Sequence, residues 1–147
     1  AETILRFICE LAHYEKAANE VVATVQTIEQ SLFGPDAVAR AVICTRDDVT
    51  IGFAVYFFNY STWLGKNGLY LEDLYVLPEH RDTGAGRALL KYLAKIAVSK
   101  NCGRFEWSVL DWNDPAIQFY RTIGALPQDG WTNYRLDKQA IEVLANS

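Results

Sequence analysis

Apolar residues recur at helical spacing in the first part of the chain, and this pattern predicts an amphipathic helix. The positions that share the apolar face are Ile4, Phe7, Ile8, Leu11 and Tyr14. A second helix is expected over about residues 25–33, because Gly34 and Pro35 follow it and end it. The chain is therefore predicted to open with two helices.

Apolar runs of strand length follow these helices. Two strands, at about 37–45 and 49–59, are predicted to form a hairpin with its turn at 46–48. A third strand begins at Leu69 and ends at Pro78, which cannot donate a backbone hydrogen bond to a sheet. A glycine turn and a long helix come next.

The last third of the sequence repeats the alternation of strand and helix. A buried strand is expected at 104–110. Asp114 and Pro115 have the residue types of an N-cap and a first helical position, so a helix should run from there to Gly124. A strand near 132–136 and a short C-terminal helix complete the chain. This order predicts an α/β (α+β) fold with a mixed central sheet flanked by helices.

Composition limits the class of protein. The chain has 147 residues, 50% of them hydrophobic, so it is long enough for one domain, 1–147, with its own core. A net charge of −4 argues against a nucleic-acid partner. Cys9, Cys44 and Cys102 form no CxxC pair, so neither a metal site nor a disulfide framework is expected. No apolar run approaches ~20 residues, and we expect no membrane partner and a reducing, cytoplasmic location.

Candidate chemistry begins after the third strand, where residues 81–86 read Arg-Asp-Thr-Gly-Ala-Gly. Gly84 and Gly86 permit positive φ and let backbone N–H groups approach an anion. The helix that follows, expected to reach about Lys100, would direct its positive end toward the same anion. A pyrophosphate group would fit this turn.

The spacing of the glycines narrows the class of pyrophosphate-containing ligand. A nucleoside-triphosphate loop needs GxxxxGK followed by Ser or Thr, and this turn has neither the spacing nor the lysine. A dinucleotide loop needs Gly or Ala at the third position of GxGxxG, where this chain has Leu89, and an acid at the ribose distance, which is missing. ATP and NAD are both disfavoured.

The remaining form, RxxGxG, resembles the coenzyme A loop of the GCN5-related N-acetyltransferases, the GNAT family. The likeness covers nearly the whole chain and is greatest to the spermidine/spermine N1-acetyltransferase-like branch, in particular to its members that acetylate thialysine on the ε-amine. The segments that carry it are 10–15, 53–77, 81–90 and 111–120. It implies the GNAT fold, with a strand before the first helix that this sequence is expected to lack.

The resemblance implies an enzyme that transfers an acetyl group from acetyl-CoA, its co-substrate, to a primary amine. It assigns Glu72 as the base, through an ordered water, and places Asp73 beside it to shape the amine pocket. In a regular strand these two acids face opposite sides of the sheet, so they have different roles unless a bulge turns them. Apolar neighbours on both sides argue against two solvated acids.

Tyr120 takes the position of the family's catalytic acid. A phenol with a pKa of ~10 is close enough to a thiol at ~8.5 to stabilise a leaving thiolate without being lost as an acid at neutral pH. The resemblance also implies coenzyme contacts from the backbone and from polar side chains. These residues are Leu74, Tyr75, Val76, Arg81, Asp82, Thr83, Gly84, Ala85, Gly86, Arg87, Asn113, Tyr120 and Arg121.

Substrate choice depends on the loop that begins at Tyr60. Polyamine enzymes of this branch have an aspartate after that tyrosine, and Ser61 occupies the position here, which favours a thialysine-like substrate over spermidine or spermine. Glu15 and Trp63 are expected to line a cationic pocket, the tryptophan through a cation–π contact. With Glu72 and Asp73 they complete the predicted amine-binding residues.

Other interpretations stay open at this stage. Polyamine acetylation and acetylation of protein lysines or an N-terminus use the same chemistry. The fold could also bind coenzyme A without turnover, with Tyr56, Phe57 and Trp63 as an exposed protein interface. The branch further implies a homodimer whose subunits share the active-site cleft.

Overall fold

The computed structural model describes residues 1–147 and divides into two compact units, 1–110 and 111–147. The first unit contains the sheet and three α-helices, and the second contains two α-helices. This mixture of helices around a mixed sheet confirms the predicted fold class.

Four strands form one sheet in the order β1-β2-β3-β4. They are β1 (Ala39–Arg46), β2 (Val49–Ser61), β3 (Lys66–Val76) and β4 (Arg104–Glu106). The first three are antiparallel, and β4 lies parallel to β3. The turn between β1 and β2 places both Asp47 and Asp48 at positive φ, as a two-residue hairpin turn requires.

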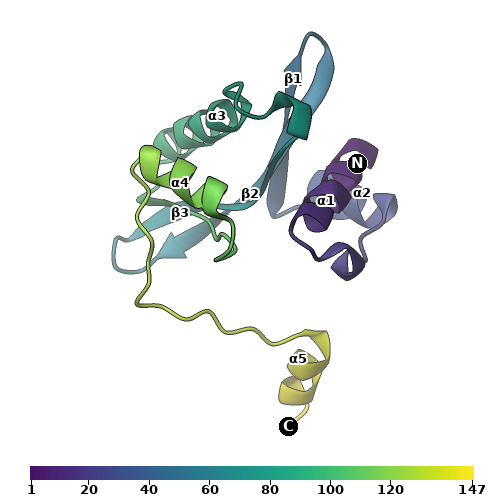
Figure 1. The fold of residues 1–147 in the computed structure, drawn as a ribbon. Helices are drawn as coiled ribbons and strands as arrows, with labels where there is room; N and C mark the ends of the chain where they lie inside the picture. The colour runs from purple at the N-terminus through teal and green to yellow at the C-terminus, as the bar shows by residue number, and fades with distance from the viewer. The chain divides into compact units, whose positions relative to one another are not determined.

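Helices α1 (Glu2–Tyr14) and α2 (Val25–Phe33) cover one face of the sheet (Figure 1). The Phe7 ring stacks on Phe53 at 5.5 Å and meets the Tyr75 ring edge-on at 6.0 Å between centroids. The predicted apolar stripe of α1 is therefore the part of the helix that enters the core, with Ile4 and Phe7 buried.

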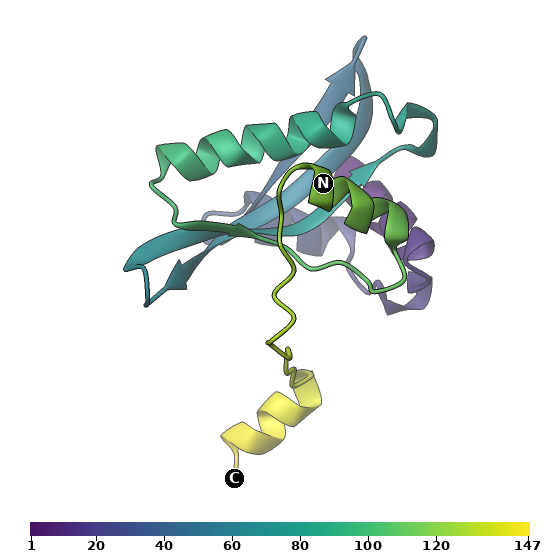
Figure 2. The same ribbon diagram turned by 60° about the vertical axis from the view of Figure 1, so that its left-hand side comes forward.

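Helix α3 (Ala85–Ser99) covers the opposite face, where it lies along β2 and β3 (Figure 2). Its buried residues are Ala85, Leu89, Leu90, Leu93 and Ala97. Tyr56 faces this helix, because its neighbour Val55 packs on the α1 side and successive strand residues point to opposite faces, and it is only 6% exposed. Tyr56 therefore belongs to the core, and its predicted alternative place in an exposed interface is wrong.

The second unit holds α4 (Asp114–Thr122) and α5 (Lys138–Ala145). Asn113, one residue before the predicted position, is the N-cap of α4, and Asp114 and Pro115 lie in its first turn. The predicted strand at 132–136 is wrong, since these residues are exposed and have no regular structure. A strand needs a partner for its backbone groups, and this unit contains no other strand.

The strand predicted at 104–110 is also too long. Only Arg104–Glu106 pair with β3, and they lie at an edge of the sheet where none of them is buried. Short 3₁₀ turns at Ala18–Glu20 and Pro78–His80 complete the elements.

Candidate active site

Strand β3 contains a β-bulge at Glu72. Val55 of β2 pairs with Asp73 and the next residue, Tyr56, pairs with Leu71, so Glu72 has no partner in the register. Two residues of β3 thus oppose one step of β2, which is the definition of a bulge. From the sequence, Glu72 and Asp73 were expected to face opposite sides of the sheet unless a bulge turned them. The structure has this bulge, so the alternation of a regular strand does not apply to the two acids.

The bulge decides which way Asp73 faces. Paired residues lie on the same face of a sheet, and successive residues alternate. Asp73 therefore shares the face of Val55, which packs in the cluster with α1 and α2, and Leu71 shares the opposite face with Tyr56. The Asp73 side chain lies on the side of the sheet where α1 ends.

This position gives Asp73 an unusual electrostatic environment. Burial, followed by the negative charges of Glu72 and Glu15, raises the pKa of Asp73 to about 6. Burial also raises the pKa of Glu15, which follows α1 directly. Glu72 itself is exposed. The structure thus brings all three predicted amine-binding acids, Glu15, Glu72 and Asp73, into one negatively charged cluster.

Next to this cluster, β3 has an open backbone edge. β4 pairs with β3 only from Gly68 to Tyr70, while β3 continues to Val76. The predicted donors Leu74, Tyr75 and Val76 therefore lie in a stretch of β3 that has a strand partner on one side only. Apart from the Val76 carbonyl, which accepts a hydrogen bond from Arg81, backbone N–H and C=O groups on the other side are available to a ligand with amide groups.

Of the two glycines expected to permit positive φ between β3 and α3, only Gly84 adopts it, and Gly86 lies within α3. Gly84 is the N-cap of α3 with φ 89°, and Asp82 also has positive φ, 59°. Thr83 is held from two sides: its hydroxyl donates to the His80 carbonyl, and its own carbonyl accepts from Arg46 Nη2 at 3.3 Å. Arg46 is a contributor that the sequence pattern did not indicate.

The start of α3 fits a pyrophosphate. No side chain caps the helix, so its first N–H groups remain for an anion at the positive end of the dipole. A Cβ added at Gly84 or Gly86 would have no atom within 4 Å, so the space above both glycines is open. Ala85 is buried and anchors the turn, and the exposed guanidinium of Arg87 follows in the first turn.

Arg81, predicted as a phosphate partner, makes several contacts with the protein itself. Its Nε donates to the Val76 carbonyl at 3.0 Å. Its guanidinium carbon lies 5.0 Å from the Tyr14 ring centroid and 5.4 Å from that of Tyr75. These contacts join the loop between β3 and α3 to β3 and to the end of α1.

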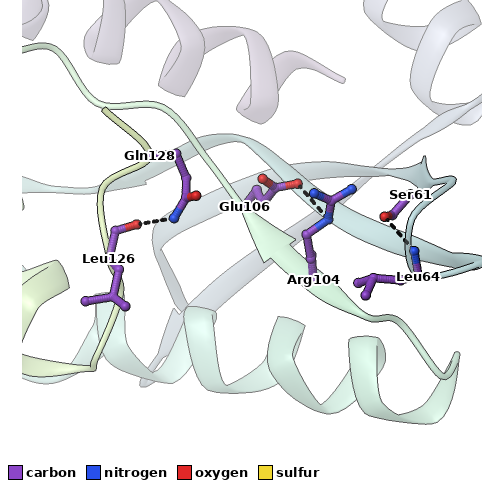
Figure 3. A network of polar contacts seen from close by, with 6 residues as sticks. All are labelled: Ser61, Leu64, Arg104, Glu106, Leu126 and Gln128. Carbon is purple, nitrogen blue, oxygen red and sulfur yellow. Dashed lines mark hydrogen bonds and ion pairs between the residues drawn. The ribbon is translucent and has the colours of Figure 1, made fainter. Parts of the chain in front are cut away.

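Ser61 and Trp63 lie at the β2–β3 hairpin, away from the acids. The Ser61 hydroxyl accepts a hydrogen bond from the Leu64 N–H at 3.2 Å and is buried within the turn (Figure 3). Ser61 pairs with Lys66, six positions before Glu72 on β3, so roughly 20 Å separate the hairpin from the acids. Trp63 is 85% exposed at the tip.

The remaining predicted residues belong to the second unit. Asn113 caps α4, Tyr120 is half-buried in its last turn beside Phe119, and Arg121 is exposed. The Tyr120 carbonyl accepts hydrogen bonds from the Ile123 and Ala125 N–H groups, which end the helix. Gly124, with φ 86°, supplies the left-handed residue after the helix end.

Two findings concern the rest of the chain. The structure contains no helix that is both long and apolar enough to span a membrane. It also contains no group of three or more His, Cys, Asp or Glu side chains placed to hold a metal ion.

Residues 7–125 match the Acetyltransferase (GNAT) family, and the chain belongs to this family. It is an acetyl-CoA-dependent N-acetyltransferase. Among its relatives, thialysine N-epsilon-acetyltransferase of Sus scrofa is 36% identical over 97% of this chain and 89% of the relative. L-Ornithine N5-acetyltransferase of Arabidopsis thaliana is 41% identical over 67% of this chain and 43% of the relative. The solved structure of an integron cassette protein from Vibrio cholerae has a TM-score of 0.78 and 29% identity, and the match covers 95% of this chain and 87% of that one.

Proposed function

We propose that this enzyme acetylates the side-chain amine of a small cationic amino acid or diamine, with a thialysine-like molecule as the preferred substrate. The observation that carries the proposal is the cluster of Glu15, Glu72 and Asp73, a negatively charged region in a chain of the acetyltransferase family. Relatives named for thialysine and for ornithine support a substrate with one reacting side-chain amine.

The acids can meet the main chemical requirement of this reaction, which is to remove a proton from the substrate amine. An amine with a pKa of ~10.4 is almost entirely protonated at pH 7, and removing its proton costs about 4.6 kcal/mol there. The family resemblance assigns the proton acceptor to Glu72 through a water. Because the bulge turns Asp73 onto the face where α1 ends, both carboxylates are candidates for this role.

The coenzyme supplies the acetyl group as a thioester, and we propose that backbone groups of β3 and of the start of α3 hold it. The open edge of β3 at Leu74, Tyr75 and Val76 suits the amides of the pantetheine arm and the thioester carbonyl. The uncapped start of α3 suits the pyrophosphate. Asn113 is proposed to bind the arm and Tyr120 to protonate the leaving thiolate, as the family pattern implies.

A spermidine or spermine substrate is the second candidate for the same pocket. A polyamine carries several ammonium groups and needs acids spread along a channel. Ser61 stands where the polyamine enzymes have an aspartate, and its hydroxyl is occupied by the hairpin turn. This arrangement weighs against polyamines.

We further propose a homodimer in the cytoplasm. Trp63 lies too far along the hairpin to reach the acids of its own chain. In a dimer it could instead line the amine pocket of the second copy. The three cysteines are free thiols, which suits a reducing compartment.

The test is thiol release from acetyl-CoA with thialysine, lysine, ornithine, spermidine, spermine and putrescine in parallel, with wild type and Tyr120→Phe. Turnover on thialysine above the polyamines, with a fall of about 10²-fold or more in the tyrosine variant, is expected. Faster turnover of polyamines would refute the substrate class. Coenzyme binding without turnover of any amine would refute the proposed activity.

A further inference from the structure

We propose that Asp73, rather than Glu72, takes the proton from the substrate ammonium. This inference rests on the proposed function, because it assumes an amine acceptor. It departs from the assignment that the family resemblance alone suggests, and it follows from the bulge in β3 and from the different surroundings of the two acids.

The geometry separates the two carboxylates. Asp73 is a paired residue of the ladder, opposite Val55, and it is fixed on the face where α1 ends. It is half-buried, between the buried strand residues Val55 and Tyr75 of the same face. Glu72 is the unpaired residue of the bulge and is exposed. A half-buried carboxylate with a fixed position is a better partner for a desolvated amine than an exposed one, because little reorganisation is needed when the charge moves.

The charges around Asp73 favour the same assignment. Glu72 from β3 and Glu15 from the end of α1 both act on it, and burial is the largest influence. Glu10 of α1 faces the neighbouring Tyr75, and the Arg81 guanidinium lies over the Tyr14 and Tyr75 rings. With a pKa raised from 3.8 to about 6, the carboxylate is on the order of a hundredfold more basic than an ordinary aspartate and still ionised at pH 7.

The proton step is simple in atoms and electrons. The ammonium N–H bond breaks, its electron pair stays on nitrogen as the nucleophilic lone pair, and the proton forms an O–H bond on Asp73. The positive charge on the substrate and the negative charge on Asp73 disappear together. Glu15 and Glu72 keep their charges, and they hold the remaining cationic group of the substrate in the pocket.

The test is the pH dependence of kcat/KM for thialysine in wild type, Asp73→Asn and Glu72→Gln. In wild type kcat/KM should rise tenfold per pH unit up to about pH 6 and then stay level, because carboxylate and ammonium react together. Asp73→Asn should lose about 10²-fold or more at pH 7 and should have no level region. Its rate should instead rise with a slope of one toward pH 10, in step with the free amine.

Glu72→Gln is the matched control. It should keep the level region, lose less than about tenfold, and move the acid limb to lower pH, because removing its charge lowers the pKa of Asp73. Coenzyme A affinity, measured by calorimetry, should be unchanged in both variants and shows that they are folded. Asp73→Glu should restore part of the level region, which a purely structural role for Asp73 would not predict.

Two results would overturn the assignment. A level profile in Asp73→Asn together with a slope of one in Glu72→Gln would make Glu72 the acceptor, while the proposed function would stand. A wild type that binds coenzyme A and acetylates none of the amines would refute the proposed function itself, and the inference with it.

Discussion

Ionised Asp73 destabilises the folded chain, and the size of this effect depends on pH. Its pKa is higher in the folded chain, about 6, than the ordinary value of 3.8, so the folded state binds more protons between these pH values. The cost is therefore absent below about pH 4 and complete above about pH 6. We expect Asp73→Asn to raise the free energy of unfolding by up to about 3 kcal/mol at pH 7.5 and by little at pH 4.

Urea unfolding of wild type and Asp73→Asn at the two pH values measures this difference. Glu72→Gln serves as the comparison: removing its charge lowers the pKa of Asp73, so it should give a smaller gain of the same sign at pH 7.5. Equal stability gains at both pH values would mean that the amide is stabilising for a reason other than the titration of Asp73.

Arg81 and Arg87 are predicted to have different roles although the sequence placed both at the coenzyme phosphates. Arg81→Lys removes the Nε donor to Val76 and the planar group above two rings, and should cost about 1–3 kcal/mol of unfolding free energy. Arg87→Gln removes an exposed charge, so stability should stay within about 0.5 kcal/mol. Coenzyme A affinity should fall several-fold in Arg87→Gln, and less at high salt.

Thermal unfolding and titration calorimetry at two salt concentrations separate the two roles. If Arg81→Lys kept wild-type stability and lost a salt-dependent part of its affinity, Arg81 would be a direct phosphate ligand.

At the scale of elements, the start of α3 gives a prediction in which stability and binding move in opposite directions. Gly86 lies inside the helix and an added Cβ meets no atom, so Gly86→Ala should stabilise the free enzyme by about 0.5–1 kcal/mol. The same methyl group would occupy the open space proposed for the pyrophosphate. Affinity for coenzyme A should therefore fall about tenfold or more, a loss of about 1.4 kcal/mol or more in binding free energy.

Two comparisons sharpen this test. Gly84→Ala also meets no atom, but with φ 89° it should cost about 1–2 kcal/mol of stability. Acetyl-pantetheine has no pyrophosphate, so its use should be the same in wild type and Gly86→Ala. An unchanged coenzyme A affinity in Gly86→Ala would place the pyrophosphate elsewhere.

Local patterns predicted the elements whose cause is local. The apolar stripe of α1 and the Gly34–Pro35 stop after α2 gave their positions, and the glycine turn gave the left-handed N-cap of α3. The end of β4 and the bulge at Glu72 depend on non-local pairing. A bulge adds twist to its strand, and β4 pairing ends at Tyr70, two residues before it. The sequence of residues 104–110 contains no pattern that indicates a bulge in β3, so the early end of β4 could not be predicted from it.

The same limit applies to the candidate site. The family resemblance named Glu15, Glu72 and Asp73 as amine-binding acids, and the structure places them close enough for Glu72 and Glu15 to raise the pKa of Asp73. Their relative burial could not be predicted, because a shift of one residue in register exchanges the two faces of a strand. The contacts of Arg81 with Tyr14 and Tyr75 likewise require the fold to bring α1 to the end of β3.

At the scale of the whole molecule, the position of Trp63 at an exposed hairpin tip, far from the acids, is not explained by contacts within one chain. It is 85% exposed at the hairpin tip, and β3 separates it from the acids by roughly 20 Å. A large exposed aromatic side chain is typical of a binding surface. If a dimer places the hairpin of one copy at the amine pocket of the other, Trp63 and Asp73 of a single site come from different chains.

This arrangement predicts complementation between two defective variants. Trp63→Ala should raise KM for thialysine by about two- to thirtyfold with little change in kcat, since a cation–π contact is worth about 0.5–2 kcal/mol. Asp73→Asn should lower kcat/KM at pH 7 far more. In mixed dimers one site carries both defects and the other carries neither, so random mixing should restore about a quarter of the wild-type sites with wild-type KM. If both residues of a site came from the same chain, mixing would yield no wild-type site at all, and the rate at low substrate would equal the average of the two variants.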